Sequence, residues 1–595
     1  MLKANPTSAV SLLLLFLSGV SPKCQEYPED VCQEHEGFVP GHNLAGEGFD
    51  VTTLERKGAS LLDMTQWESP DGTCNLCQNP LLEDKPLQRL PLAAADWEVD
   101  VSCRRKLHSS LQESGISVVQ GAGADVKNDW RMGLEVEVKP EARAQVTLAG
   151  SHSKMADFSI DKSGRDKYSF ASHEVSCVFY KFRIGHHQPL TQHFRRALKV
   201  LPAKYHRPSW LEYHQLIETY GTHFITKLHL GGRVRDVTAI RECETVLDGM
   251  SAEEVKDCLS VEASASIGAG KVKMDAAYQK CEEMRNKQSF KGSFHQMYTE
   301  RHTEIVGGNS HADLLFSDDL SKEAFQEWAE GLKTMPGLVS YSLAPIHTLV
   351  AKEDPRRESL RQAVSEYVTR RALWRNCTQP CSPGTQRSTR DPCSCVCPNN
   401  GNTNSMCCSK KRGLAKLTVT IKRAHGLWGD YSTSTDAYVK VLFQGKESRT
   451  STVWNNNDPV WNIHFDLGNV QLLGETSKLR VQVWDEDNKY DDDLLGTCEE
   501  SLQSGERQEK LCYLDHGRLD FQYHLVCGPH LGGHHCMDYT PQQPRYEGTF
   551  LQRMGKGDQG AGDASARGPA PVLTGMAQGD SSTAAKKLPR LRDPI

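Results

Sequence analysis

The stretch Tyr220-Gly-Thr-His-Phe224 is followed after six residues by a glycine pair, and this string is the most distinctive in the chain. Its members are Tyr220, Gly221, Thr222, His223, Phe224, Gly231 and Gly232. Glycine lets a backbone bend or approach a neighbouring strand closely, so we expect a bend or a close contact at the glycine pair. No serine or cysteine nucleophile with a catalytic local signature accompanies His223, which favours a hydrogen-bonded core imidazole over a catalytic base.

Two stretches that flank this string alternate apolar and polar residues. The first runs over 134–148, where Pro140 is the one misfit and predicts a strand edge or a bulge. The second runs from Leu259 to Ala269 and, after a shift of one residue, resumes from Val272 to Tyr278. Both exceed the ~5–6 residues of a typical strand, and their apolar faces contain many small alanines.

The alternation has two interpretations that periodicity alone does not separate. One is a half-buried sheet in a soluble domain. The other is a transmembrane β-strand, which needs ~9–11 residues with apolar side chains outward and polar side chains inward. Because Ala and Ser are also compatible with helix, the same segments can be helical in one state and extended in another.

The amino terminus predicts a secreted protein. Residues 1–21 combine a positive Lys3, a short apolar run and small residues near Ser21, which is typical of a cleaved secretory signal. A secreted chain can use its 20 cysteines for disulfides. The glycosylation acceptor Asn376, in Asn-Cys-Thr, fits the same route.

The cysteine spacing offers zinc as an alternative at three places, and at each we favour disulfides. These places are Cys74/Cys77, Cys377/Cys381, and the histidine-rich segment around Cys536. The sequence leaves open whether Cys258 and Cys281 pair with each other. The other disulfide candidates are Cys24, Cys32, Cys74, Cys77, Cys103, Cys177, Cys243, Cys377, Cys381, Cys393, Cys395, Cys397, Cys407, Cys408, Cys498, Cys512, Cys527 and Cys536.

Length and composition bound the class of protein. A chain of 595 residues predicts about four domains. A net charge of −6 argues against a nucleic-acid binder that relies on bulk positive charge. The longest apolar run, Ala9–Val20, is shorter than the ~18–20 residues of a spanning helix, which excludes a multi-span helical membrane protein.

Shifts in composition divide the chain. A large region covers 22–375, and a cysteine- and proline-rich module of 376–411 follows it. Residues 414–514 contain β-branched and aromatic runs of period two, which predict an all-β sandwich. A disulfide-bearing extension covers 515–540, and the glycine- and proline-rich tail of 541–595 is expected to be disordered.

The predicted sandwich has a concentration of carboxylates in two of its loops. These would repel one another without a cation, and Ca²⁺ takes ~6–8 oxygen ligands. The pattern resembles a C2 domain, which has an Asp pair on one loop and D-x-D-x5-D on another. By that resemblance the ligands are Asp430, Asp436, Asp485, Asp487 and Asp493, with Asp491 and Asp492 as additional candidates.

Aromatic residues flank the same loops: Trp428, Tyr431 and Tyr490. Exposed aromatics beside a cation site are suited to the interface of a bilayer. We therefore expect Ca²⁺ to neutralise the loops and let these side chains enter lipid.

The string around His223 matches the signature of the membrane-attack-complex/perforin (MACPF) family at every position, and the chain resembles this family over about residues 22–540. The resemblance implies an α+β MACPF domain with a bent antiparallel sheet and two helical clusters, a small disulfide-rich EGF-like module and an all-β C2 sandwich. In the family the clusters, here about 134–185 and 257–305, unfurl into amphipathic hairpins. Subunits join into a ring, and the hairpins close a transmembrane β-barrel.

The resemblance also implies a function, which is that of a secreted, calcium-dependent, pore-forming cytolytic protein and not an enzyme. Such a protein is stored in cytolytic granules, binds target-cell phospholipid, forms a homo-oligomer and lets co-secreted granule proteases enter. The alternative is a non-lytic family member that binds membranes for adhesion or signalling. A lipid hydrolase is disfavoured, because the chain has neither G-x-S-x-G nor H-E-x-x-H.

Overall fold

The computed structural model describes residues 24–542 and 551–553, apart from 104–105, 137–143, 187, 269–273, 288–291, 310–313, 317–321, 378–379, 382, 390–392, 430, 432, 475–476 and 488–490. The predicted signal peptide and almost all of the predicted tail therefore lie outside the described residues. Among the residues that are described, no helix is both long enough and apolar enough to cross a membrane.

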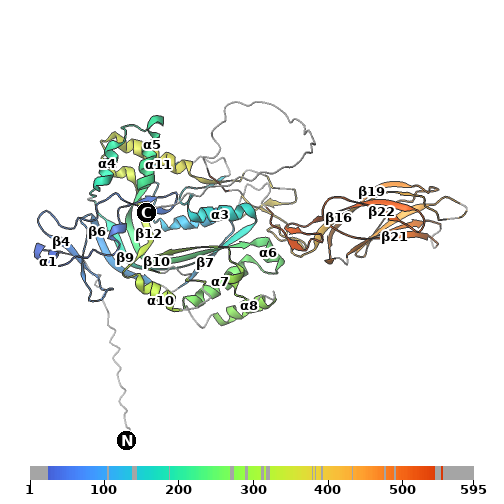
Figure 1. Ribbon diagram of the computed structural model, residues 1–595, viewed down its shortest axis with the longest axis horizontal. Helices are drawn as coiled ribbons and strands as arrows, with labels where there is room; N and C mark the ends of the chain where they lie inside the picture. The colour runs from blue at the N-terminus through green and yellow to red at the C-terminus, as the bar shows by residue number, and fades with distance from the viewer. Residues whose placement is uncertain are drawn as a thin grey trace, which may run out of the picture. The chain divides into compact units, whose positions relative to one another are not determined.

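An eight-stranded antiparallel sheet forms the centre of the large region (Figure 1). Two long strands dominate it: β9 (Tyr168–Ile184) and β10 (His223–Arg241) pair along most of their length. Both are rich in aromatic and β-branched residues, as strands buried on two faces require. Around them lie β2 (Glu47–Asp50), β3 (Glu55–Ser60), β6 (Ala94–Cys103), β7 (His108–Gln112), β11 (Arg301–Val306) and β12 (Gly337–Pro345).

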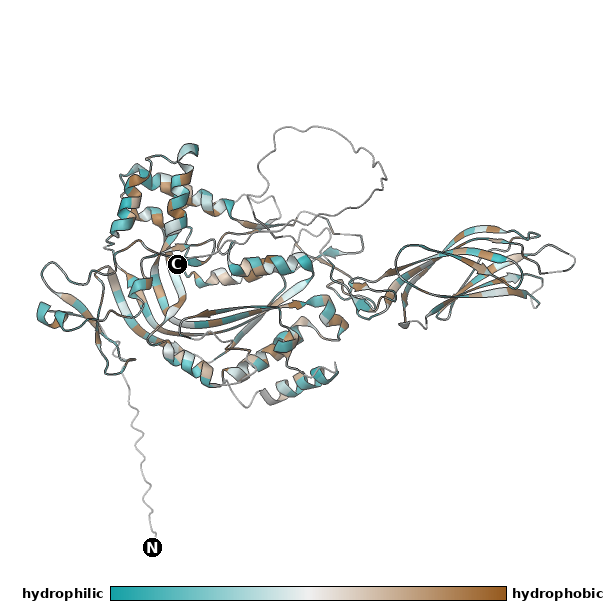
Figure 2. Ribbon diagram, viewed as in Figure 1, coloured by the Kyte–Doolittle hydropathy of each residue, from teal (hydrophilic) through white to brown (hydrophobic). Residues whose placement is uncertain are grey.

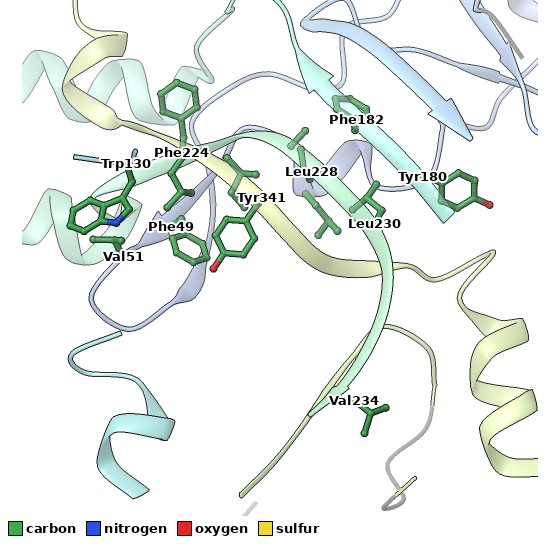
Figure 3. Packing of buried hydrophobic residues seen from close by; sticks show 14 of the residues in the cluster. Phe49, Val51, Trp130, Tyr180, Phe182, Phe224, Leu228, Leu230, Val234 and Tyr341 are labelled. Atoms are coloured by element: carbon green, nitrogen blue, oxygen red, sulfur yellow. The ribbon is translucent and has the colours of Figure 1, made fainter. Parts of the chain in front are cut away.

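The sheet bends within β10. The pairing register of β10 with β9 shifts between Leu230 and Gly231, and Figure 3 shows the strand curving between Leu230 and Val234. Phe224, Leu228 and Leu230 on this strand belong to the main core cluster.

Helices cover both faces of the sheet. Figure 1 shows α3 (Lys154–Arg165) on one side of β9 and β10, and α7 (Ala252–Ser266) on the other. α2 (Gly115–Ala122) contacts α3, and α8 (Met274–Lys287) and α9 (Phe294–Met297) contact α7. Figure 1 shows α6 (Glu242–Leu247) and α10 (Lys322–Gly331) on the α7 side. Further helices are α1 (Glu29–Gln33), α4 (Gln192–Val200), α5 (Trp210–Tyr220) and α11 (Pro355–Arg370), with 3-10 turns at His42–Leu44, Gly123–Asp125, Arg207–Ser209 and Ile346–Leu349.

Two small three-stranded sheets complete this region. One consists of β1 (Gln25–Tyr27), β4 (Cys74–Gln78) and β5 (Leu87–Arg89). The other consists of β8 (Ala144–Thr147), β13 (Leu373–Asn376) and β26 (Leu551–Arg553). Asn376, the glycosylation candidate, is thus the last residue of β13.

The two alternating stretches fold differently from a simple strand. The second is helical: 259–266 lies in α7 and 274–278 in α8. Of the first, only Ala144–Thr147 is a described strand, and Pro140 lies outside the described residues. The expected cluster boundaries are also too wide, because 168–184 is the core strand β9 and 301–306 is the strand β11. These two segments are strands because both pair with β10, the first along its length and the second over six residues.

The cysteine-rich module is held together by disulfides. Its strands are the short pair β14 (Gln386–Arg387) and β15 (Cys395–Val396). Three disulfides lie within it: Cys377–Cys393, Cys381–Cys395 and Cys397–Cys407.

The carboxy-terminal region is a sandwich of two four-stranded sheets. One has the order β19-β16-β23-β22 and the other β18-β17-β20-β21. Their bounds are β16 (Leu414–His425), β17 (Ala437–Phe443), β18 (Lys446–Arg449), β19 (Val460–Gln471), β20 (Lys478–Asp485), β21 (Asp493–Ser501), β22 (Gln508–Tyr513) and β23 (Arg518–Cys527).

One strand of the sandwich falls in the predicted extension. β23 pairs with both β16 and β22, so the sandwich continues past residue 514. The reason is its own alternation, since Leu519, Phe521, Tyr523 and Leu525 are buried in the sandwich core. The short strands β24 (Leu531–Gly532) and β25 (Asp538–Tyr539) follow β23 in the extension.

Candidate functional site

The signature string forms a buried clamp between strands. Tyr220 ends α5, Gly221 has a left-handed φ of 80°, and Thr222 and His223 lead into β10. The Val51 amide donates to the Thr222 hydroxyl (3.1 Å), and that hydroxyl lies 2.8 Å from His223 Nδ1. His223 Nε2 is 3.0 Å from the carbonyl oxygen of Trp130.

The hydrogen-bond partners in the clamp specify one tautomer of the His223 ring. A carbonyl oxygen can only accept, so Nε2 carries the proton and Nδ1 accepts from Thr222. Burial is complete and holds the pKa of His223 at about 4, below the ordinary 6.5, so the ring is neutral. These contacts assign His223 to the core.

The glycine pair lies at the bend of β10. A Cβ on Gly231 would overlap the backbone carbonyl of Cys177 on β9, so the two strands approach as only glycine allows. Gly232 lies against Leu332 and Trp328 of the helical segment that follows β11. Phe224 is buried in the main core.

The alternating sequence divides the apolar residues of helix α7 between two faces, whereas a simple amphipathic helix has one apolar stripe. On a helix, residues spaced by four share a face, so a period-two apolar set divides between opposite faces. Leu259, Ala263 and Ile267 are buried, whereas Val261 and Ala265 are half-buried. Figure 2 shows both hydrophobic and hydrophilic residues along this helix.

Helix α7 is fixed at its start and in its middle. Ser251 and Glu254 form a reciprocal capping box at its amino terminus. Cys258 forms a disulfide with Cys281 of α8, which resolves the question that the sequence left open.

Helix α3, on the other face, is fastened by charges. Glu300 accepts from Tyr168 (2.8 Å) and Arg241 (2.7 Å) and pairs with Lys162 of α3 at 3.0 Å. Burial alone would raise the pKa of Glu300, but these partners hold it below its ordinary value. Glu300, the residue just before β11, thereby holds α3 on the face of the sheet opposite α7.

The carboxy end of α3 contacts the short strands that follow the sandwich. Buried Asp166 accepts from the Tyr539 hydroxyl and lies 3.3 Å from His530 Nδ1. The sequence offered this histidine-rich segment as an alternative zinc site, but among the described residues no metal-binding group of three such side chains occurs. Cys527 and Cys536 pair with each other instead.

Every cysteine is paired, which accounts for the whole candidate set. The closely spaced cysteines do not pair with each other. Cys77 pairs with Cys24 and Cys74 pairs with Cys32. Cys377 pairs with Cys393 and Cys381 pairs with Cys395. Cys408, the seventh cysteine of the module, crosses to Cys243 at the start of α6. The remaining pairs are Cys103–Cys177 and Cys498–Cys512.

Two loops at one end of the sandwich, β16–β17 and β20–β21, carry the predicted calcium ligands. Asp485 is buried, and its carboxylate accepts from the Asp436 backbone amide at 2.7 Å. Asp485 and Asp493 are direct cross-strand partners on β20 and β21. Like charges placed directly opposite are destabilising, so a bound cation would relieve the pair. Carboxylate oxygens are the ligands that Ca²⁺ prefers. The described residues do not gather three such side chains into a metal-binding group here, and Asp430 lies outside them.

The remaining candidate ligands differ in their surroundings. Asp487 and Asp491 are exposed, whereas Asp492 accepts from the Tyr438 hydroxyl (2.8 Å). Burial, together with this carboxylate, raises the pKa of Tyr438 to about 12. Asp430 lies outside the described residues, but its neighbour Gly429 packs so closely on the Asp485 carboxylate that a Cβ there would overlap it.

Exposed aromatics surround the acidic loops. Tyr431 is 96% exposed and packs edge-on against Trp428, which is 42% exposed. Tyr490 lies outside the described residues. The structure adds Trp454, which is 62% exposed on the β18–β19 loop. The backbone amide of its neighbour Asn455 donates to the Asp436 carboxylate. A tryptophan followed by three asparagines between two strands was the signal that could have indicated it.

Comparison with known proteins agrees with this architecture. The family model described as "MAC/Perforin domain" matches residues 40–376, "Perforin-1-like, EGF domain" matches 376–410 and "C2 domain" matches 415–514. The chain belongs to the membrane-attack-complex/perforin family, whose pore-forming members are not enzymes.

Among curated relatives, the chain is 47% identical to Perforin-1 of Homo sapiens over 87% of this chain and 93% of that protein. It is 46% identical to Perforin-1 of Mus musculus over 90% of this chain and 96% of that protein. Complement component C6 of Bos taurus is 24% identical over 62% of this chain and 38% of its own length. The chain is thus a pore-forming, membrane-binding protein of perforin type.

Proposed function

We propose that this protein is a secreted, calcium-dependent cytolytic pore former. The C2 sandwich docks on target-cell phospholipid when Ca²⁺ binds its acidic loops. Docked subunits associate into a ring, and the segments on both faces of the sheet convert into transmembrane hairpins. By resemblance to cytolytic members of the family, the protein waits in granules and opens the way for co-secreted granule proteases.

The observation that carries the proposal is the residue pattern of α7. A helix that only packs on a sheet needs one apolar stripe. The period-two pattern leaves Val261 and Ala265 half-buried on the side away from Leu259 and Ala263. In an extended arm all four side chains would lie on one face, as a lipid-facing strand requires.

The docking step is supported by the loop end of the sandwich. Trp428, Tyr431 and Trp454 are exposed there, beside the cross-strand pair of Asp485 and Asp493. Without a cation these carboxylates keep the end strongly anionic, which opposes entry into a membrane surface containing acidic lipids. Ca²⁺ supplies the positive charge that the loops lack.

The test is dye release from vesicles of phosphatidylcholine and phosphatidylserine. We expect the full chain to release dye with Ca²⁺ and to neither bind nor release in a chelator. Asp493→Asn should need more Ca²⁺ for both. Calcium-dependent binding without release would instead favour the non-lytic alternative, and release that continues in a chelator would refute the calcium requirement.

A further inference from the structure

The disulfide between α7 and α8 joins the two arms of the segment that the proposed function converts into a hairpin. Cys258 and Cys281 are both buried, with Cα atoms 5.6 Å apart. A disulfide constrains the same two residues whatever secondary structure surrounds them. It therefore restricts every conformation that the two arms can adopt together.

In an antiparallel pair, this restriction selects one register. Residues directly opposite each other have Cα atoms ~4.5–5.5 Å apart, within the ~4.4–6.8 Å that a disulfide allows. Diagonal neighbours are ~7–8 Å apart and fall outside it. Cys258 must therefore lie opposite Cys281, which places Ser260 opposite Gln279 and Val261 opposite Tyr278.

This register agrees with the amphipathic pattern of both arms. Val261 meets Tyr278 and Ala263 meets Ala276 on one face, whereas Ser260 meets Gln279 on the face that carries the disulfide. The shift of one residue between the arms is what opposing strands need for both apolar sets to share a face. A slip of one residue would turn one arm's apolar side chains to the polar face.

The disulfide also lies at a suitable depth. From Cys258 to Gly268 there are about ten residues, or ~34 Å of strand, and at a tilt of ~40° this spans ~26 Å along the membrane normal. The apolar band of a membrane barrel is ~25 Å tall. Cys258 and Cys281 would thus lie at the near edge of the bilayer, on the water-filled side. Lys280, beside Cys281 on the apolar face, could extend its ammonium into the headgroups.

We propose that the Cys258–Cys281 disulfide stays closed during insertion and fixes the register of the second hairpin. The inference rests on the proposed function, because it requires that α7 and α8 become the two arms. It assigns the two cysteines a positioning role that the helical form alone does not require.

The test uses the full chain with the native disulfide intact and two added cysteine pairs that share one member. Ser260→Cys with Gln279→Cys is the matched pair, since these residues are opposite in the proposed register. Ser264→Cys with Gln279→Cys is the mismatched control, because four residues of offset place the thiols beyond disulfide reach. Both variants are assembled on calcium-containing vesicles, oxidised mildly, and their thiols are counted by maleimide gel shift.

In pores we expect the matched pair to lose both added thiols and the mismatched pair to keep them. The unmodified protein should show no free thiol from Cys258 or Cys281 after pore formation. Cross-linking of the mismatched pair, failure of the matched pair to cross-link, or release of the native thiols would overturn the register. Dye release by the same samples is scored separately, so a chain that forms no pores contradicts the proposed function and not the register.

Discussion

Lysine substitutions at two adjacent positions of α7 should have similar effects on the helical form but different effects on the inserted form. Ala265 and Ser264 are both half-buried in the helix. Lysine is a good helix former and can extend its charged end into water from either position. Ala265→Lys and Ser264→Lys should therefore each change the free energy of unfolding by less than about 1 kcal/mol.

In the hairpin the two positions face opposite ways. Ala265 belongs to the apolar set and faces lipid, whereas Ser264 belongs to the polar set and faces water. A lysine on the lipid face costs ~2–4 kcal/mol at the bilayer midplane and ~0–1 kcal/mol near the interfaces. Ala265 is three residues before Gly268, at intermediate depth, so we expect about 2 kcal/mol per subunit, or roughly a 30-fold loss of insertion.

The assay is vesicle dye release with Ca²⁺, normalised to bound protein by co-sedimentation and to folded protein by thermal unfolding. Ala265→Lys should bind vesicles normally and release dye at least about tenfold more slowly than the parent chain. Ser264→Lys should resemble the parent in all three measurements. Equal loss of release for the two variants, with both folded and bound, would refute the assignment of these residues to opposite faces.

Three further predictions concern the clamp and the docking loops. Thr222→Val should lower the free energy of unfolding by about 2–4 kcal/mol in a urea titration, since it leaves the Val51 amide and Nδ1 of His223 without their partner. Thr219→Val, which removes an exposed hydroxyl, should change it by less than about 0.5 kcal/mol. The folded-state pKa of His223 (about 4) lies below its unfolded value of ~6.5, so stability falls as pH drops through that window. Between pH 7 and pH 5 this group should contribute a loss of about 2 kcal/mol, which His223→Gln should remove from the pH dependence of urea unfolding. Trp454→Ala should weaken calcium-dependent vesicle binding about fivefold, since burial of ~50 Å² of indole contributes about 1 kcal/mol. Leu473→Ala removes a side chain that is exposed at the opposite end of the sandwich, so it should leave vesicle binding unchanged.

The sequence predicts the fold wherever a short-range pattern and the long-range packing favour the same local structure. The string from Tyr220 to Phe224 predicts the family because its members have local structural roles. Gly221 has the left-handed φ, and Thr222 and His223 complete one hydrogen-bond chain. The partners of that chain, Val51 and Trp130, are 171 residues from Thr222 and 93 residues from His223 along the sequence. No spacing rule could have named them.

Two regions that the sequence leaves open show where its patterns stop being informative. The segment from Leu259 alternates like a strand, yet it is helical because the capping box at Ser251 and the disulfide at Cys258 favour α7. Cys408 belongs to the cysteine-rich module by its position in the sequence, but it pairs with Cys243, 165 residues away. Local periodicity does not report either tertiary constraint.

For the candidate calcium ligands, the sequence indicates the residue type but not the arrangement of the side chains. Asp436, Asp485 and Asp493 lie together because strand register places them at one edge. Asp492 follows the same motif, but its carboxylate binds the Tyr438 hydroxyl. A run of three aspartates cannot indicate which side chain turns inward.

The geometry of α7 also explains, under the proposed function, why assembly has to precede insertion. A hairpin alone in lipid would bury its apolar face but leave the outer backbone groups of both arms without hydrogen-bond partners. Each such group costs several kcal/mol in hydrocarbon, far more than exposing half of Val261 or Ala265 costs in water. Neighbouring subunits are the only source of those hydrogen bonds in lipid. The helical form is therefore favoured until a ring supplies a strand on each side. Until then the capping box stabilises the start of α7, and the Glu300 contacts hold α3 on the sheet.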